Sequence, residues 1–582
     1  MNRLPPLSSP VSRQLLLLLV LLLAFLLPRR LELDRFVTVD EPKWLLRSAN
    51  FFNALAQRNL KDTYQREHPG VTITWAGTAG FLWRFPGYYK ISPDGNMTPT
   101  RFHTFLQSHG RSSLELLVAG RIFVLLGIVA ALGLSFVIAT RLLGILPAFL
   151  AFLLVAFDPF SIGHSRLLHL DGLLSALMLL SLLAFVAYLS QNRRTGYLML
   201  SAVSAGLAWL TKSPAFFLAP FFGLLMVMDW IRTNGSASPH RSASTHRSTP
   251  TISLRQIWQV FAPLLLWFVV AWLVFFLLWP AMWVDPVGSL ARVFSQATAY
   301  ASEGHEIPSY FYGETQAGGI SAWYFYPLVY LWRITPFILV GLAVVILALL
   351  FPKVFPLESK RIVLALLLFA GLFTIFMSFG AKKFDRYLLP VFAPLDLIAA
   401  LGWLALLQVF RRYSKGVPVI ARRVAAGLLV GLALLGQLWG VVQTYPYYLN
   451  YYNPILGGPK AATRVMMVGW GEGLDQAARY LNSLPQTGKE RAISWYGDGC
   501  FSYFYDGVTV PIGLDFTFND LRKTDTVVLY LNQWQRGLPS PEFMAYFEQL
   551  TPGYVVRIGN LEYVRVYSLR NAPQMPILTP GE

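Results

Sequence analysis

Long apolar runs alternate with short polar segments along most of this 582-residue chain. A run of about 20 apolar residues is long enough to cross a bilayer as a helix. The first run, residues 15–27, ends in Pro28-Arg29-Arg30 with no small-residue cleavage site, so we expect an uncleaved helix. Further runs cover residues 116–139, 144–158, 168–190, 197–211, 214–231, 257–282, 323–351, 362–380, 388–410 and 424–443. We therefore predict an all-α polytopic membrane bundle of about eleven transmembrane helices.

The pattern changes after residue 443. Residues 471–484 have the periodicity of an amphipathic helix, and four later segments have the aromatic and β-branched content typical of strands. These segments are residues 492–496, 526–531, 554–558 and 563–567. We predict a transmembrane domain over residues 1–443 and a small α/β domain over residues 444–582.

Composition narrows the class of protein. Hydrophobic residues make up 55% and charged residues only 13% of the chain, against roughly 25% charged in a soluble domain. The net charge of +18 does not indicate nucleic-acid binding, because the Lys and Arg residues lie between apolar runs and form no basic stripe with aromatics. The one cysteine, Cys500, excludes an internal disulfide and a cysteine-based metal site.

The distribution of positive charge predicts the orientation. Most basic residues of the loops between apolar runs fall on the cytoplasmic side if the N-terminus is cytoplasmic and the chain crosses the bilayer eleven times. The Ser-, Thr- and Pro-rich segment 233–256 then becomes a cytoplasmic linker. The first polar loop (29–113), a lid-length loop (283–322) and the whole tail lie on the opposite face. We expect a multi-pass plasma-membrane protein whose site and tail are extracytoplasmic.

An acidic pair, Asp40-Glu41, stands just outside the first apolar run. His68-Pro69-Gly70 follows in the same polar loop. Adjacent carboxylates at a membrane boundary could catalyse a reaction on a membrane-borne substrate. Alternatively, Asp40 caps a helix that starts at Pro42, because an acid before a proline is a common helix start.

A further carboxylate, Asp171, begins an apolar run in Ser165-Arg166-Leu167-Leu168-His169-Leu170-Asp171. Ionisable residues at membrane depth are costly, so they are candidates for function. In the alternative interpretation, Asp171 pairs with Arg166 and fixes the end of a helix.

Three cations, Lys382, Lys383 and Arg386, stand at the outer boundary, where the distribution of positive charge disfavours them. Cations at this depth can bind a phosphate or diphosphate, Arg through a bidentate fork and Lys as a point charge. The alternative is that they extend along the membrane surface to lipid headgroups without a specific ligand.

The loop 283–322 has the length of a lid over a cavity. Its Glu303, His305 and Glu306 could ligate a metal or hold a leaving phosphate, although such spacing also arises by chance. The tyrosine-rich segment 445–452 is most simply an aromatic belt at the membrane interface. The sequence contains no phosphate loop, His-Glu-x-x-His or Gly-x-Ser-x-Gly motif, which argues against a nucleotide-powered pump.

Several of these motifs, taken in order, resemble the polyprenyl-phosphate-sugar-dependent glycosyltransferases of the glycosyltransferase-C superfamily. The most similar branches are the protein O-mannosyltransferases and the lipid A aminoarabinose transferases. The motifs are Asp40-Glu41, His68-Pro69-Gly70, Ser165 to Asp171, Leu210-Thr211-Lys212-Ser213-Pro214, Arg386-Tyr387-Leu388-Leu389-Pro390, Tyr447 to Pro454 and Gly469-Trp470-Gly471-Glu472. The chain has His-Pro-Gly where many members have His-Pro-Pro.

The resemblance implies a mechanism and roles for individual residues. A lipid carrier presents an activated sugar on the outer leaflet, so no nucleotide is needed there. Asp40 would be the base and Glu41 would orient the site as the second catalytic acid. The donor phosphate would be bound by Arg166, Lys382, Lys383 and Arg386, with His68, Asp171, Lys212, Glu303, His305 and Glu306 as further site candidates. A divalent metal stays open, since no ligand set can be matched.

The sequence thus predicts an integral-membrane hexosyl- or pentosyltransferase. It would move one sugar, plausibly mannose, from a polyprenyl phosphate to an extracytoplasmic protein or glycolipid, with inversion. A lipid-linked sugar flippase or transporter is an alternative, but the halves of the chain show no internal repeat. An oligosaccharyltransferase-like ligase is another, although Trp495-Tyr496-Gly497-Asp498 does not match the Trp-Trp-Asp motif of those enzymes.

Overall fold

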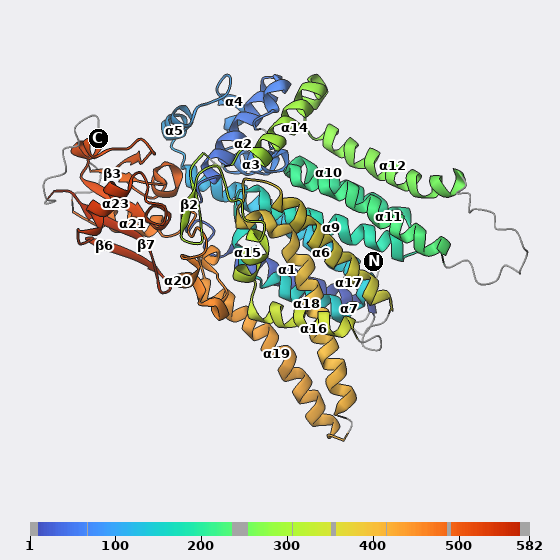
Figure 1. Cartoon of the computed structure of the whole chain (residues 1–582). Helices are drawn as coiled ribbons and strands as arrows, with labels where there is room; N and C mark the ends of the chain where they lie inside the picture. The colour runs from blue at the N-terminus through green and yellow to red at the C-terminus, as the bar shows by residue number, and fades with distance from the viewer. Residues whose placement is uncertain are drawn as a thin grey trace, which may run out of the picture.

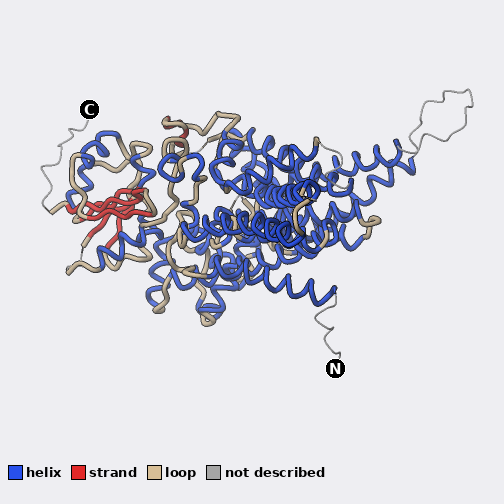
Figure 2. Tube along the Cα trace, turned by 90° about the horizontal axis from the view of Figure 1, so that it is seen from below, coloured by secondary structure: helices blue, strands red, loops and turns tan. Residues whose placement is uncertain are grey.

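The computed structural model of the chain describes residues 10–66, 68–235, 254–304, 306–350, 357–414, 416–485 and 490–570. Helices form a large bundle, and the tail lies at one end of it (Figure 1). Figure 2 shows the strands of the tail gathered at that end, away from the long helices. The predicted fold class, a helical membrane bundle with a small α/β tail, is confirmed.

Eight of the described helices are long and apolar enough to cross a membrane, or up to ten when each of two bent pairs counts as one span. The eight are α1 (Pro10–Arg30), α6 (Ser113–Leu143), α9 (Leu170–Ser190), α11 (Leu218–Gly235), α12 (Leu254–Leu277), α17 (Leu357–Ser378), α18 (Leu389–Tyr413) and α19 (Val419–Thr444). The remaining predicted run forms α10 (Thr195–Thr211), which is apolar but shorter. Each of the eleven predicted runs is therefore helical.

Two predicted spans are bent at a proline. α7 (Ile145–Ala156) and α8 (Pro159–Ser165) meet at 68°, and α15 (Phe325–Arg333) and α16 (Pro336–Leu349) meet at 119°. In each pair the second helix starts with a proline at its first turn, after a capping residue whose side chain accepts a backbone N–H. The first bend turns the chain into the short helix that leads to the Arg166–His169 loop.

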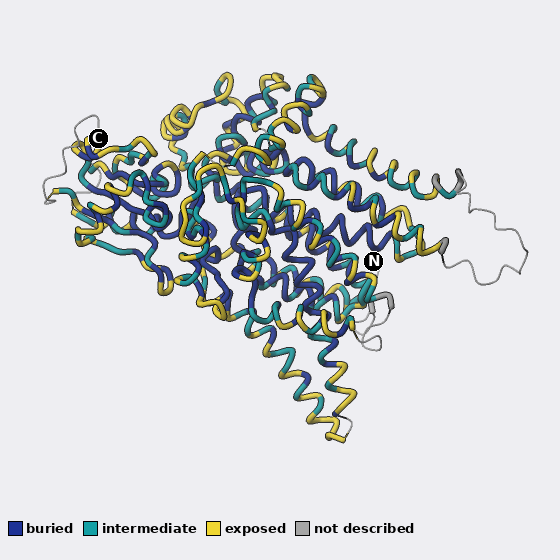
Figure 3. The backbone as a smooth tube through the Cα atoms, in the orientation of Figure 1, coloured by how far each residue is buried: buried dark blue, intermediate teal, exposed yellow. Residues whose placement is uncertain are grey.

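The centre of the bundle is α9, of which 94% is buried in its most apolar window. It packs against α6, α10 and α18, and buried backbone fills the middle of the bundle (Figure 3). The peripheral helices α12 and α19 instead expose large side chains such as Phe261 and Leu428. A buried central helix can hold a carboxylate at its outer end in a fixed position.

The first polar loop folds into short helices over the outer ends of these spans. They are α2 (Glu41–Ala56), η1 (Leu60–Thr63), α3 (Val71–Arg84), α4 (Tyr88–Ile91) and α5 (Pro99–Ser108). Gly70 has φ +61°, and a Cβ there would lie 2.3 Å from the ring of Trp44. Its N–H donates to the carbonyl of Thr211 at 3.2 Å. The glycine of the His-Pro-Gly motif is thus required sterically, and it brings His68 toward Lys212.

The lid-length loop is structured. It contains α13 (Ala281–Val284), α14 (Pro286–Ser302) and a hairpin of β1 (Ser309–Phe311) and β2 (Glu314–Gln316). Backbone hydrogen bonds join Ala381 to Ala301 at 3.0 Å and Ile320 to Ala381 at 3.2 Å. Another joins Tyr312 to Val465 at 2.9 Å. The loop therefore links the segment before Lys382 to the tail.

The tail contains a five-stranded mixed sheet in the order β4-β3-β5-β7-β6. Its strands are β3 (Arg491–Ser494), β4 (Val508–Pro511), β5 (Thr526–Tyr530), β6 (Tyr554–Ile558) and β7 (Leu561–Ser568). β3 pairs in parallel with β4 and β5, whereas β7 is antiparallel to β5 and β6. The sequence predicted four of these strands and α21 (Leu474–Asn482), but missed β4, an edge strand of four residues that ends in proline.

The tail packs closely on the bundle. Tyr447 donates to both carboxylate oxygens of Asp475 at 2.9 Å, and Tyr563 donates to Asn450 at 2.7 Å. A Cβ on Gly471, which has φ +119°, would lie 2.3 Å from the carbonyl oxygen of Val37. Tyr447, Tyr448, Tyr451 and Tyr452 are at most 5% exposed. The prediction of an aromatic belt at the interface is therefore wrong for these four rings, which are covered by the bundle and the tail, whereas Tyr445 is 41% exposed. The domain boundary at residue 443 stays a prediction.

Candidate active site

Four segments meet at one end of the bundle. They are the turn before α2, the loop before α9, the end of α10 and the segment before α18. The last of these segments includes η3 (Asp385–Leu388). Each lies at a helix terminus, where the backbone leaves the regular ladder and the side chains can point toward a common centre. The segments bring together Asp40, His169, Lys212 and Arg386.

Asp40 occupies the N-cap position of α2, but its side chain makes no capping hydrogen bond and faces this centre. Its Oδ2 lies 3.6 Å from Nε2 of His169 and 3.5 Å from Nη2 of Arg386, and its side chain is 32% exposed. Burial raises the pKa of Asp40, but His169 and Arg386 outweigh burial and lower the pKa below its usual value. Asp40 is therefore an accessible, ionised carboxylate held by two cationic partners.

Arg386 is held by aromatic rings. Its guanidinium carbon lies 4.3 Å from the ring centroid of Phe384 and 4.4 Å from that of Trp470. Its Nε is 3.5 Å from Oδ2 of Asp171 and makes no hydrogen bond within the described chain. Stacking thus fixes the guanidinium plane, while its contacts to Asp40 and Asp171 are ion pairs without short hydrogen bonds. Such a group is positioned to donate to an anionic ligand.

Asp171 pairs with Lys212. Nζ of Lys212 donates to Oδ1 of Asp171 at 2.8 Å and lies 3.9 Å from the ring centroid of Tyr387. Arg166, the partner that the alternative interpretation assigned to Asp171, lies elsewhere. Burial lowers the pKa of Lys212, and the carboxylate of Asp171 offsets part of this effect.

His169 joins the two carboxylates. Its Nε2 faces Asp40 at 3.6 Å and its Nδ1 faces Asp171 at 3.3 Å. Burial lowers the pKa of His169, but Asp171 and Asp40 outweigh burial and raise the pKa above its usual value. An imidazole with a carboxylate at each nitrogen retains its second proton more strongly.

The surrounding pocket is strongly basic. Six Lys and Arg side chains line it against one carboxylate, Asp40. They are Lys43, Arg47, Arg66, Lys212, Lys382 and Arg386. An enclosed surface with this charge attracts a phosphate group and stabilises negative charge that develops on it.

Lys382 and His68 complete this pocket beside Tyr300 of α14. Nζ of Lys382 lies 4.4 Å from the Tyr300 ring centroid, and the His68 ring stacks on the same tyrosine at 4.8 Å. Burial lowers the pKa of Lys382, and the charge of Arg386 adds to the effect. Burial and the charges of Lys212 and Lys382 lower the pKa of His68 well below its usual value. His68 is therefore a neutral imidazole at neutral pH.

Glu41 points away from the pocket. Its fully buried carboxylate accepts hydrogen bonds from Nε and Nη2 of Arg121 at 2.7 and 2.5 Å and from the N–H of Leu168 at 2.8 Å. It also accepts from the N–H and hydroxyl of Thr38 at 2.9 and 3.0 Å. Glu41 thus ties the Asp40 turn to α6 and to the loop before α9. These five bonds occupy the carboxylate and fit the expected orienting role of Glu41, which stays a prediction.

Two predicted phosphate ligands lie outside the basic pocket. Arg166 donates to the carbonyls of Pro28, Leu31 and Glu32 at 3.2, 2.7 and 2.6 Å. Lys383 donates to the carbonyl of Ile320 at 2.6 Å and lines a neighbouring pocket. Backbone carbonyls engage both cations, and of the predicted phosphate ligands only Lys382 and Arg386 line the basic pocket. The phosphate-binding roles stay predictions.

The candidates in the lid loop are not brought into the site. Glu303 and Glu306 are exposed and line neither pocket, and His305 lies outside the described residues. Within the described ranges no group of three or more His, Cys, Asp or Glu side chains is arranged to hold a metal. Asp40 and Asp171 both face cationic side chains, so the carboxylates present do not fit a divalent-metal site.

Sequence reasoning missed His169 and Trp470 as site residues, although both stand in quoted motifs. It also missed Arg121, whose signal is a lone arginine within the apolar run 116–139. No signal in the sequence marks Lys43, Arg47 and Arg66 as site residues, because they lie in a polar loop where charged residues are common. Only the positions of the helices in that loop bring their side chains to the pocket.

Comparisons with known proteins give one family match. Residues 113–245 match the family described as dolichyl-phosphate-mannose-protein mannosyltransferase. This segment runs from α6 through α11 and includes Asp171 and Lys212. The match confirms the resemblance to the glycosyltransferase-C superfamily. No curated protein matches the chain.

Solved structures of two proteins are loosely similar. The apo state of ArnT from Cupriavidus metallidurans is 14% identical with a TM-score of 0.47, and covers 98% of this chain and 100% of its own. The same protein bound to undecaprenyl phosphate is 13% identical with a TM-score of 0.42, at 97% and 100% coverage. The apo oligosaccharyltransferase of Archaeoglobus fulgidus is 12% identical with a TM-score of 0.45, and the match covers 97% of this chain and 76% of that one. With TM-scores below 0.5, these likenesses assign no residue and no substrate.

Proposed function

We propose that this chain, a multi-pass membrane protein resembling the glycosyltransferase-C superfamily, transfers one sugar from a polyprenyl phosphate to an acceptor hydroxyl. The observation that carries the proposal is the shared pocket of Asp40 and Arg386, whose charged atoms lie 3.5 Å apart. A proton acceptor beside a cluster of cations matches the two needs of this reaction. One is removal of a proton from the acceptor, and the other is stabilisation of a leaving phosphate.

In the proposed reaction the acceptor hydroxyl gives its proton to Asp40 while its oxygen attacks the anomeric carbon. The bond between that carbon and the phosphate oxygen breaks on the opposite side, so the configuration inverts. The lipid phosphate leaves with one additional negative charge, and Arg386 and Lys382 neutralise it. Proton removal by a positioned carboxylate contributes about 10²–10⁴ in rate. The proton then passes from Asp40 to solvent.

The ion pairs of Asp40 make its strength as a base depend on whether the donor is bound. Arg386 lowers the pKa of Asp40, which makes Asp40 a weak base before the donor binds. A phosphate at Arg386 competes with Asp40 for the guanidinium. Donor binding would therefore raise the pKa of Asp40 and strengthen the base when the acceptor needs it.

The family match suggests which sugar and acceptor to test first. The matched family is described as transferring mannose from dolichyl phosphate to protein, so mannose, a lipid-phosphate carrier and an extracytoplasmic protein are the first substrates to test. A glycolipid acceptor is the second. The distribution of basic loops supports an orientation with the site on the extracytoplasmic face.

Reconstituted vesicles test the proposal. Purified protein is supplied with undecaprenyl-phosphate mannose and with membranes from cells that lack the protein. We expect labelled mannose on a protein or lipid of those membranes and release of free undecaprenyl phosphate. Movement of the intact donor across the bilayer, with the sugar–phosphate bond unbroken, would identify a transporter and contradict the proposal.

A further inference from the structure

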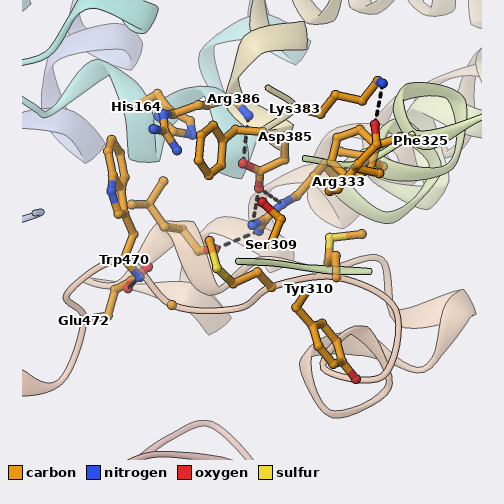
Figure 4. A pocket seen from close by; sticks show the side chains of 17 residues that line it. His164, Ser309, Tyr310, Phe325, Arg333, Lys383, Asp385, Arg386, Trp470 and Glu472 are labelled. Carbon is orange, nitrogen blue, oxygen red and sulfur yellow. Dashed lines mark hydrogen bonds and ion pairs between the residues drawn. The ribbon is translucent and has the colours of Figure 1, made fainter. Parts of the chain in front are cut away.

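A second pocket adjoins the basic pocket and shares Phe384 and Arg386 with it. The empty space between its lining residues is about 680 Å³, which includes space open to solvent. Figure 4 shows side chains of the bundle on one side and Trp470 and Glu472 of the tail on the other. Transfer reactions need two substrates to meet, and these two pockets meet at Arg386.

The second pocket has little spare positive charge. Arg333 uses all five of its N–H groups within the protein: on Asp385 at 2.9 and 2.6 Å, on the carbonyls of Leu449 and Tyr451 at 2.8 Å each, and on the hydroxyl of Tyr452 at 2.9 Å. Lys383 donates to one backbone carbonyl, as described above, and keeps its charge. Three cations line this pocket with two carboxylates, Asp385 and Glu472, whereas six cations line the basic pocket with one carboxylate. The second pocket is therefore much closer to neutral, which argues for an uncharged ligand.

His164 of α8 lines this pocket with unused hydrogen-bonding capacity. It is 3% exposed, and neither ring nitrogen has a hydrogen-bond partner in the described chain. A neutral imidazole can donate from one nitrogen and accept at the other. Leaving such a buried group unpaired costs about 1–3 kcal/mol. A ligand hydroxyl in the pocket would give one of these nitrogens a partner.

The remaining lining is apolar and aromatic. Trp470, Phe325 and Phe384 contribute ring surfaces, and Met466 and Met467 contribute flexible thioethers. The buried carboxylate of Glu472 accepts the N–H of Trp470 at 2.5 Å and the hydroxyl of Tyr530 at 3.1 Å, which fixes the turn that carries Trp470. Aromatic and apolar side chains can pack against the C–H groups of a ligand, and the few polar side chains can bind its hydroxyls.

We propose that the second pocket binds an uncharged sugar ring, with its hydroxyls on His164 and its C–H face against the aromatic side chains. This inference rests on the proposed function, which places the donor phosphate at Arg386 in the shared wall. The ring belongs either to the sugar of the lipid-linked donor or to a sugar already present on the acceptor. In both cases it lies next to the phosphate that leaves.

His164→Leu is the variant of choice, because it removes no hydrogen bond from the described protein. Thermal stability should be unchanged or higher. His103→Leu, an exposed position on α5, is the matched control. Met467→Trp is a second variant, which fills the pocket without removing a polar group.

Binding is measured on the whole purified protein with three probes: undecaprenyl phosphate, undecaprenyl-phosphate mannose and methyl α-mannoside. Loss of one hydrogen bond predicts roughly tenfold weaker binding. If the ring is the donor sugar, both pocket variants bind undecaprenyl-phosphate mannose about tenfold more weakly and bind undecaprenyl phosphate as the wild type does. If the ring is an acceptor sugar, both lipids bind normally and only methyl α-mannoside binding falls.

Two results would overturn the inference. One is wild-type binding of all three probes by both variants, and the other is equal weakening of the bare and the sugar-bearing lipid. Failure of the proposed function gives a different pattern, since the wild-type protein would then not bind undecaprenyl phosphate. Methyl α-mannoside would still report on the second pocket in that case.

Discussion

Replacement of Glu41 by Gln tests whether this residue positions the site or takes part in the chemistry. Glu41 accepts five hydrogen bonds, two of them from Arg121, and is fully buried. A glutamine has the same shape but carries two N–H donors in place of one acceptor oxygen. Some of the five donors would then face another donor, and the charge of Arg121 would be buried without its counter-charge.

The magnitude follows from that buried pair. Removing one partner of a buried ion pair typically destabilises a protein by about 3–5 kcal/mol. Replacing both partners removes the uncompensated charge, so E41Q/R121M should be less destabilised than the sum of the single variants. Because Glu41 holds the turn that carries Asp40, we also expect a loss of transfer that parallels the loss of stability.

The assay combines unfolding of the purified protein in detergent with the rate of transfer at low temperature, where each variant stays folded. We expect E41Q to unfold far more readily than wild type and to keep measurable transfer when folded. Wild-type stability together with a loss of transfer above about 10³-fold would refute the reasoning. That result would place Glu41 among the reacting groups.

Three further predictions follow from the site. His169→Gln should flatten the pH dependence of stability. The pKa of His169 is raised in the folded protein, so the stability that His169 contributes is full below pH ~6.5 and is lost as pH rises through the raised pKa. Melting temperatures at pH 6 and pH 9 check this, and an equal change in melting temperature in wild type and variant would refute it. Arg386→Lys keeps the charge but loses the fork and the stacking on Phe384 and Trp470, so transfer should fall by about 10²-fold, whereas a wild-type rate would remove Arg386 from phosphate binding. Lys212→Met removes the 2.8 Å hydrogen bond to Asp171, which keeps His169 and Arg386 as neighbours, and should destabilise by about 1.5–3 kcal/mol. In chemical unfolding the effects of K212M and D171N should be non-additive, and additive effects would contradict the pairing.

Much of the fold could be predicted because membrane helices are specified by long apolar runs. Each of the eleven predicted runs is helical, and the bends at Pro159 and Pro336 divide two of them. The short edge strand β4 was missed because four residues ending in proline carry little periodic signal. The structured lid was missed for a different reason, since its order comes from hydrogen bonds to Ala381 and Val465, which are distant in sequence.

The site could be predicted only in part. Asp40, His68, Lys212, Lys382 and Arg386 line one pocket as expected. Arg166 and Lys383 could not be separated from them by sequence, because an arginine that binds backbone carbonyls and one that faces a pocket are the same residue type. Glu41 and Asp40 are neighbours whose opposite orientations are decided by a buried partner, Arg121, on another helix.

The central claim is that Asp40 removes a proton while the neighbouring cations hold the donor phosphate. Single-turnover transfer by Asp40→Asn protein, loaded with undecaprenyl-phosphate mannose, tests it most directly. Because the substitution removes a negative charge from a basic pocket, we predict donor binding at least as tight as in the wild type and transfer slower by about 10²–10⁴-fold. Transfer at the wild-type rate, or loss of donor binding in this variant, would contradict the claim.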